Sequence, residues 1–322
     1  MIAQVYAQAV TLAEYAKGLE EGSLERVFIE TFTETSDLLA AMPIRAATKG
    51  KFRFERLTQL PTVAQRAFNE AGHESTGKFD MGEEGVYLMD EYIKVDRALV
   101  DMAGPERRYR QERAKMIAMA QNASRVIING DGDADPREAS GFKKRFTVLA
   151  KSLFHNSALS GGAALSLQNL DIVRRSVNKP THWIFPYDLM AFVDAAARSP
   201  TLTNNQFMQG MDQELGRIVT KLAGIPILYG YEPDDSPLLL DFNEVASGGG
   251  AAVTGSIYCV SLDKTDERCF LVEGTALAVR DEGQLQGQPF LSTHAKWDWG
   301  IATVHPRSGA RLTSNTKATI VA

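Results

Sequence analysis

Residues Trp297–Leu312 read WDWGIATVHPRSGARL, and this stretch does most to decide the fold. This stretch overlaps the last of a series of expected strands, which spans Phe290–Val304. The others are Ile225–Tyr229, Leu238–Asp241, Ser256–Leu262, Phe270–Glu273 and Ala276–Asp281. Helical patterns precede these strands without a regular alternation of strand and helix. The sequence therefore predicts an α+β fold.

A second distinctive stretch, Glu30–Pro43, lies near the other end and reads ETFTETSDLLAAMP. Residues 1–48 around it are expected to form an arm more than a core element, because Gly18 and Gly22 weaken any helix. From Glu14 to Asp37, seven acids stand against two bases, which gives a charge of −5.

The next segment predicts an extended β-hairpin. Lys51–Leu57 alternates, with Phe52 and Phe54 on one face, and a second alternating stretch runs from Gly85 to Val95. The long polar excursion between them favours a functional or disordered loop that leaves the body. From Lys49 to Phe79, six bases stand against three acids, which gives a charge of +3.

The longest expected helix spans Gly104–Asn129, a rod about 35 Å long at the helical rise. Pro105 suits its start, and Gly130 is expected to close it as a left-handed cap. Shorter helices are expected over Ser166–Val177 and Tyr187–Arg198. A further one is expected to present Phe207, Met211, Leu215, Ile218 and Leu222 on one side.

Composition sets limits on function. The chain has 322 residues, 44% of them hydrophobic, with a net charge of −5 and a pI of about 5.7. This balance disfavours a sequence-specific reader of DNA, which usually carries a basic surplus. No run approaches the roughly 18 apolar residues of a membrane helix, and no export signal opens the chain, so we expect a soluble protein without membrane contact.

No stretch carries convincing catalytic, cofactor or metal chemistry. The acidic turn at Asp131 resembles a calcium loop but has Pro136 where glycine is needed and Phe142 where a bidentate Glu is needed. Gly250–Ser256 has the glycine spacing of a phosphate loop without its lysine. The histidines are scattered, and the two cysteines, at 259 and 269, are expected to be buried thiols. We expect a protein that is not an enzyme.

The expected long helix carries a cluster of bases that permits two interpretations. Its members are Arg107, Arg108, Arg110, Arg113 and Lys115. They form either a solvated face or a face turned toward DNA, where Arg107, Arg110 and Arg113 could bind phosphate without reading sequence.

Taken together, these stretches resemble the major capsid protein of tailed bacteriophages, which has the Hong Kong 97-type shell fold. Trp183–Leu189 and Gly224–Ile227 strengthen the resemblance. The resemblance implies an N-terminal arm (1–48), an extended loop (49–95), a peripheral domain with a spine helix (96–159), an axial domain with a mixed sheet and flanking helices (160–285), and a return to the peripheral domain (286–322).

The resemblance also implies a function and partners. Copies of the chain would assemble as hexamers and pentamers into an icosahedral virion shell in the host cytoplasm, around double-stranded DNA that they contact without sequence specificity. A separate scaffolding protein and a portal are implied. We expect the arm acids to meet the loop bases between copies, through Glu25, Glu30 and Glu34 on one side and Lys51, Arg53 and Arg56 on the other. A cellular nanocompartment shell and an α/β enzyme of unknown reaction are the alternatives.

Overall fold

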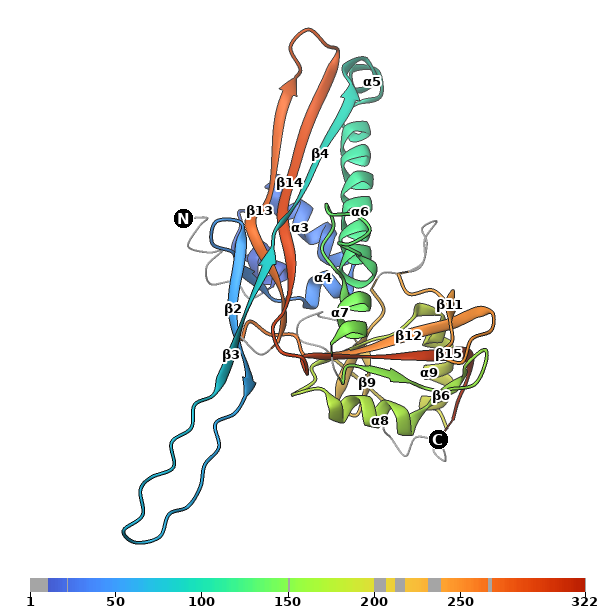
Figure 1. The fold of residues 1–322 in the computed structure, drawn as a ribbon. Helices are drawn as coiled ribbons and strands as arrows, with labels where there is room; N and C mark the ends of the chain where they lie inside the picture. Colours follow the sequence, from blue (N-terminus) through green and yellow to red (C-terminus); the bar gives the residue numbers. More distant parts are fainter. Residues whose placement is uncertain are drawn as a thin grey trace.

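The computed structural model describes residues 11–21, 23–149, 151–199, 207–211, 218–230, 239–265 and 268–321. Two bodies meet in the ribbon, with a long hairpin projecting from them (Figure 1). The upper body contains the longest helix, α6 (Glu106–Asn129), beside three long strands. The lower body contains a second sheet that lies across the end of the first body.

The sheet of the upper body has the order β1-β13-β14-β4. Antiparallel pairing joins the three long strands, and Leu271 lies opposite Ile301 near the base of β13 and β14. The bounds are β1 (Ile44–Ala46), β4 (Tyr87–Asp96), β13 (Cys269–Gln284) and β14 (Phe290–Thr303). Helices α2 (Leu12–Lys17), α3 (Leu24–Thr35), α4 (Asp37–Ala41), α5 (Arg97–Ala103) and α7 (Phe142–Val148) complete this body.

The lower body is built on a nine-stranded sheet, counted over the described residues, with the central order β5-β15-β12-β7-β10-β9-β8. Helices α8 (Leu167–Ser176) and α9 (Met190–Ala197) and the short helix η1 (Tyr187–Leu189) flank it. Its strands are β5 (Leu153–His155), β6 (Ala163–Ser166), β7 (His182–Ile184), β8 (Phe207–Met211), β9 (Ile218–Leu222), β10 (Ile225–Leu228), β11 (Glu244–Val245), β12 (Ala252–Val260) and β15 (Gly309–Val321). The mixed sheets and helices confirm the predicted α+β class.

The described part of residues 1–48 belongs to the core, so the expectation of an arm in place of a core element is wrong there. Phe28, Ile29 and Phe32 of α3 have no exposed surface, and the Phe32 ring meets the edge of Trp297 at a centroid distance of 6.0 Å. Ser36 ends α3 and begins α4, and its hydroxyl accepts a hydrogen bond from Ser124 of α6. Ser23 caps α3 by accepting a hydrogen bond from the Arg26 backbone, and Ser36 caps α4 by accepting one from the Leu39 backbone, which favours both helices.

The long helix appears as predicted, from Glu106 to Asn129, but its end differs from the expectation. Gly130 has φ −56°, so it is no left-handed cap. Glycine is needed there because an added Cβ would lie 2.3 Å from the carbonyl oxygen of Ala139. Close packing against the returning chain, and not backbone handedness, explains this glycine.

The predicted helix over Phe207–Leu222 is wrong. The described residues form two antiparallel strands, β8 and β9, in which Phe207 lies opposite Leu222. Leu215 lies outside the described residues. Gly210 and the β-branched run Ile218–Thr220 disfavour a helix, and cross-strand pairing buries Phe207 and Leu222, two of the apolar positions that suggested one. Leu239–Asp241, expected as part of a strand, forms none, although Leu239 and Leu240 are buried.

The sheets do not follow the boundary expected at residue 285. β13, expected in the axial part, pairs with β14 in the upper body. β15, expected in the return to the peripheral part, pairs with β12 in the lower body and buries Ala310 and Leu312 there. The chain therefore leaves the lower body after β12 and re-enters it with β15.

Candidate assembly surfaces and the polar junction

The projecting hairpin pairs differently from the prediction. β2 (Lys51–Gln59) pairs with β3 (Lys78–Gly85), whereas β4, which covers most of the expected second strand, joins β14. Phe52 and Phe54 do share one face, and the Phe52 ring meets Phe270 edge-on. The Arg45 guanidinium lies 4.8 Å from the centre of the Phe52 ring. This small aromatic cluster attaches the base of the hairpin to the upper body.

The three hairpin bases expected to contact another copy already have partners on their own hairpin. Lys51 and Arg53 both bind the Glu83 carboxylate, and the Arg53 contact is 2.9 Å. Arg56 lies 3.2 Å from Asp80. Hydrogen bonds from Lys51 and Arg53 hold the pKa of Glu83 below its usual value. Glu83 and Asp80 lie just beyond the segment whose charge was counted from sequence, which is why their effect was missed.

The three arm acids lie on α3. Glu30 accepts a hydrogen bond from Arg26 at 2.7 Å, and Glu25 is half-buried and adds to the raised pKa of Tyr15, whose main cause is burial. Glu34 is exposed and lines a groove between α3 and α6 together with Glu30.

The basic residues of α6 divide into two groups. Arg107, Arg110 and Arg113 are exposed, and Arg110 lies 3.7 Å from Glu106. Arg108 instead turns inward, toward Glu112 and the β13–β14 pair. It donates hydrogen bonds to Glu112 at 2.9 Å and to Thr293 at 2.7 Å, and it forms an ion pair with Asp281 at 2.6 Å. Arg108 therefore joins the helix to the sheet and does not belong to a solvated basic face.

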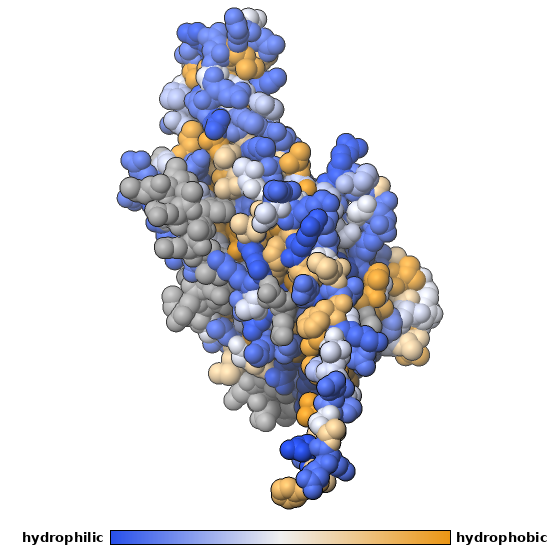
Figure 2. Space-filling view, turned by 60° about the vertical axis from the view of Figure 1, so that its left-hand side comes forward, coloured by the Kyte–Doolittle hydropathy of each residue, from blue (hydrophilic) through white to orange (hydrophobic). Residues whose placement is uncertain are grey.

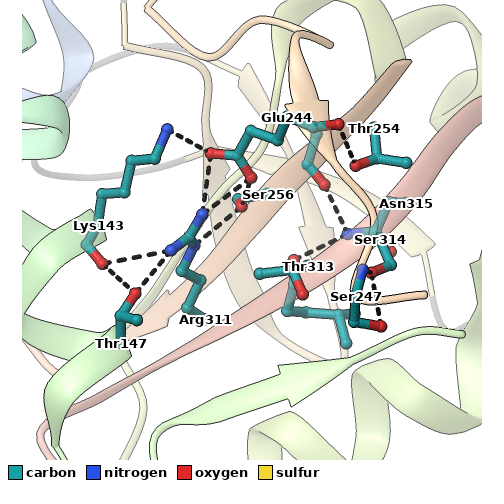
Figure 3. Close-up of polar contacts among 12 residues, drawn as sticks. Lys143, Thr147, Glu244, Ser247, Thr254, Ser256, Arg311, Thr313, Ser314 and Asn315 are labelled. Carbon is teal, nitrogen blue, oxygen red and sulfur yellow. Dashed lines mark hydrogen bonds and ion pairs between the residues drawn. The ribbon is translucent and has the colours of Figure 1, made fainter. Parts of the chain in front are cut away.

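A polar network joins α7 to the lower sheet (Figure 3). Its centre is Arg311 of β15, whose guanidinium contacts both carboxylate oxygens of Glu244 at 2.9 Å. The same guanidinium donates to Ser256 at 2.9 Å and to the Thr147 hydroxyl at 2.7 Å. The ammonium group of Lys143 lies 2.7 Å from Glu244. One helix and three strands thus meet at a single carboxylate.

The two central side chains of this network are nearly closed to solvent, whereas Lys143 at its border is partly exposed. The side chains of Arg311 and Glu244 are 9% and 13% exposed. Burial opposes ionisation of Glu244, but the positive charge of Arg311 and the hydrogen bonds from Lys143 and Ser256 outweigh it and lower the pKa of this carboxyl. No local motif marks the network in the sequence, because its members come from four separate segments.

A second buried carboxyl lies in the core of the upper body. Glu273 of β13 is 2% exposed, and one of its oxygens accepts a hydrogen bond from the Trp297 indole at 2.6 Å. The other oxygen has no hydrogen-bond partner among the described residues. Burial raises the pKa of Glu273 to about 7, and the bonds from Trp297 and from the Leu277 backbone only partly oppose this shift.

The described ranges contain neither a cluster of metal-binding side chains nor a helix suited to span a membrane. No group of three His, Cys, Asp or Glu side chains there could hold a metal ion. At the acidic turn, Lys144 binds Asp131 and Asp133, which favours a solvated turn over a calcium loop. Cys259 and Cys269 are free, buried thiols, as predicted. None of the described helices is long and apolar enough to cross a membrane.

Comparison with solved structures identifies the fold. The SrpI encapsulin of Synechococcus elongatus PCC 7942 is 14% identical, with a TM-score of 0.62 over 88% of this chain and 89% of that chain. A chain of Mycobacterium phage Bobi is 12% identical, with a TM-score of 0.55 over 94% of this chain and 98% of that chain. The capsid of a native GTA particle is 14% identical, with a TM-score of 0.53 over 87% and 90%. These likenesses define a Hong Kong 97-type shell fold.

Sequence comparison adds the family. The model of the family described as major capsid protein GP7 matches residues 20–195, which is more than half of the chain. No curated protein matches by sequence. The chain belongs to the GP7 major capsid protein family and is a shell-forming capsid subunit of the virion, as the sequence predicted.

Proposed function

We propose that copies of this chain assemble as hexamers and pentamers into an icosahedral shell around the double-stranded DNA genome of a tailed phage, and that the chain catalyses no reaction. The observation that carries the proposal is the family match over residues 20–195, which include the hairpin and the long helix. Assembly in the host cytoplasm is part of the proposal.

The hairpin is the proposed principal contact between copies. An isolated two-stranded hairpin is only marginally stable in water, so a long one gains from a surface to lie on. Its outward residues include Leu57, Phe79 and Met81, which are exposed by 39%, 65% and 71%. Large exposed apolar side chains gathered on one element are typical of an interaction surface.

The arm acids Glu25, Glu30 and Glu34 and the loop bases Lys51, Arg53 and Arg56 remain proposed contacts between copies. Their part is smaller than the sequence suggested, because Glu83 and Asp80 already offset two of the three positive charges. Exposed ion pairs are worth about 0–1 kcal/mol each. We therefore assign these residues to the alignment of copies and to assembly rate more than to affinity.

The other partners are also proposals. Arg107, Arg110 and Arg113 lie exposed along α6 and suit contacts with DNA phosphates that do not depend on sequence. A separate scaffolding protein and a portal are proposed for assembly. The satellite phage P4 procapsid, a structure that includes a size determination protein, matches this fold at 10% identity with a TM-score of 0.51, which supports an assembly partner of this kind.

A cellular compartment shell is the second candidate, favoured by the likeness to the encapsulin. Purified particles distinguish the two functions. DNA that resists nuclease inside particles made during infection supports the phage shell. Particles that instead hold a protein cargo and no DNA would support the compartment.

Shortening the hairpin tests its proposed role in assembly. Gln59 and Lys78 lie opposite each other at the end of the β2–β3 pairing. Residues 60–77 can therefore be replaced by Asn-Gly, which favours a two-residue hairpin turn. The shortened subunit should fold and remain soluble but close no shell. Normal particles from this variant would overturn the role assigned to the hairpin.

A further inference from the structure

The hydrophobic core of the upper body contains a carboxyl group that its surroundings only half satisfy. Glu273 lies opposite Trp299 in the β13–β14 pairing, on the face of the sheet that α3 covers. Trp297 donates its indole hydrogen bond to one oxygen of Glu273, stacks on Trp299 and meets the Phe32 ring of α3. The other oxygen is buried without a hydrogen-bond partner among the described residues. Figure 2 shows that the outer end of this body has a mostly hydrophilic surface, whereas this acid is held in the core.

The charged groups on the three described elements that pack against β13 do not compensate this carboxyl. On β14, Asp298 lies between the two tryptophans in sequence and so points to the other face of the sheet, where Lys296 is 3.4 Å away. On β1, Arg45 lies over the Phe270 ring on that same other face. The residues that α3 buries are uncharged, namely Phe28, Ile29, Thr31 and Phe32. Burial therefore raises the pKa of Glu273 to about 7, and no charged neighbour is among the causes of this shift.

An irregularity in β13 accompanies the buried carboxyl. The pairing with β14 shifts register between Glu273 and Thr275, and again between Thr275 and Ala278. Bulges of this kind interrupt the ladder of hydrogen bonds and redirect side chains, and they are frequent beside functional sites. The strand is therefore least regular where its acid is buried.

Of the elements around Glu273, α3 can separate most easily. Backbone pairing joins β13 to β1 and β14, whereas α3 meets the sheet through apolar side chains such as Phe32. The side-chain hydrogen bonds of α3 end within the helix itself and come from Arg26, Thr31, Thr33 and Thr35. A helix of 12 residues is marginal by itself, so α3 depends on the packing of its buried face. A groove of about 800 Å³ between α3 and α6 also brings solvent to its flank.

We propose that Glu273 is a proton-controlled latch: its neutral carboxyl keeps α3 packed on β13 and β14, and its ionised form favours a locally open subunit in which α3 has separated from the sheet. A buried carboxylate without a counter-ion is costly, and opening restores its hydration. The opening is local because the paired strands stay together.

The latch has a consequence for assembly, which rests on the proposed shell function. The helix that it controls carries Glu25, Glu30 and Glu34, the proposed contacts with another copy. A packed α3 holds these acids in place in advance, whereas a separated α3 must be ordered again when copies meet. Loss of the Glu273 proton should therefore slow assembly.

Hydrogen exchange of the unassembled wild-type subunit tests the latch. Peptides from α3 are compared at pH 5.5 and pH 8 after correction for the intrinsic exchange rate, and peptides from α8 in the lower body are the internal reference. The carboxyl regains its ordinary pKa near 4.5 when it is hydrated, so the protection of α3 should fall about 30-fold between the two pH values. The protection of α8 should fall much less, because the opening is confined to α3.

Two variants assign the effect to one residue. Glu273→Gln can still accept the Trp297 hydrogen bond but cannot ionise, so its α3 peptides should be protected equally at both pH values. Histidine side chains also change charge in this pH range. His294→Gln, which removes a contact with Asp90 on the other face of the sheet, is therefore the control and should keep the wild-type dependence on pH.

Three results would overturn the latch. The first is equal protection of α3 at both pH values in the wild type, and the second is the same fall in Glu273→Gln as in the wild type. The third is an equal loss of protection in α8, which would show that the whole subunit unfolds and that no local opening occurs.

Light scattering tests the consequence for assembly, with the assembly partners present. Glu273→Gln should assemble faster than the wild type at pH 8 and at the same rate at pH 5.5. Equal rates at pH 8 would remove the control of assembly, although the latch measured on the subunit would stand. Failure of both proteins to form particles at either pH would count against the shell function and not against the latch.

Discussion

Replacing Glu244 with Gln tests whether the polar network holds the two bodies together. The substitution keeps the size of the side chain and removes its charge, while Arg311 and Lys143 stay in place. Arg311, whose side chain is 9% exposed, would then have no counter-ion within the network. Removing one member of a buried ion pair costs about 3–5 kcal/mol, because the remaining charge stays desolvated. We expect about 3 kcal/mol here, since Gln can still accept one hydrogen bond from Arg311.

Lys143→Met is the matched control. Lys143 binds the same carboxylate at 2.7 Å, but its side chain is 40% exposed. Exposed pairs contribute about 0.2–1 kcal/mol, so this variant should lose at most about 1 kcal/mol. A difference of about 2 kcal/mol between the two variants is therefore the expected result.

Urea unfolding of the unassembled subunit, followed by circular dichroism, measures the difference. The slope with urea should be the same in both variants if only stability changes. A loss from Glu244→Gln no larger than that from Lys143→Met would refute the reasoning, because it would show that Arg311 does not need its partner. Acid provides a second test. Because folding lowers the pKa of Glu244, its ionised carboxylate stabilises the folded subunit. This stabilisation is complete above the ordinary pKa near 4.5 and is lost as the pH falls through the lower, folded-state pKa.

Three further predictions follow from other parts of the structure. Glu273→Gln should stabilise the subunit more at pH 8 than at pH 5, because the pKa of Glu273 is raised to about 7 and its ionisation destabilises the fold as the pH rises from about 4.5 through 7. Urea unfolding midpoints at pH 5 and pH 8 measure the effect. An equal shift of the midpoint at both pH values would contradict the prediction. Gly309→Ala should cost about 1–3 kcal/mol in thermal unfolding, since its Cβ would lie 2.1 Å from the Phe146 ring, and an unchanged melting temperature would argue against the packing described. Reversing Lys51, Arg53 and Arg56 to Glu together should slow assembly at low salt, because the new carboxylates repel Glu25, Glu30 and Glu34 of another copy as well as Glu83 and Asp80 of their own hairpin. High salt should restore the rate by screening this repulsion. Wild-type light-scattering kinetics at low salt would show that these charges have no part in assembly.

The sequence predicted best the elements whose pattern is long and local. The helix ending at Asn129 and the strand beginning at Phe290 carry enough periodic residues to be assigned by themselves. The aromatic face of Phe52 and Phe54 was also readable, because alternation shows directly in the sequence.

The failures came from features that depend on distant partners. The apolar spacing of Phe207 and Leu222 suits one helix face, yet the same two residues also suit opposed positions on antiparallel strands. Gly130 is explained by Ala139, which belongs to the returning chain. The ion-pair partners of Lys51 and Arg53 could not be assigned from the sequence, because only the β2–β3 pairing brings Glu83 beside them.

The same limit applies to the functional surfaces. The exposed arginines of α6 could be proposed from sequence, but the inward turn of Arg108 toward Asp281 could not, since the two residues are far apart in the chain. Glu244 and Arg311 likewise meet only because β11 and β15 both flank β12.

Cryo-electron microscopy of particles assembled from this chain tests the central claim most directly. A closed icosahedral shell of hexamers and pentamers, in which the hairpin of each subunit lies over a neighbouring copy, is the predicted result. A subunit that stays monomeric with its assembly partners present, or a closed shell in which each hairpin folds back on its own chain, would contradict the account.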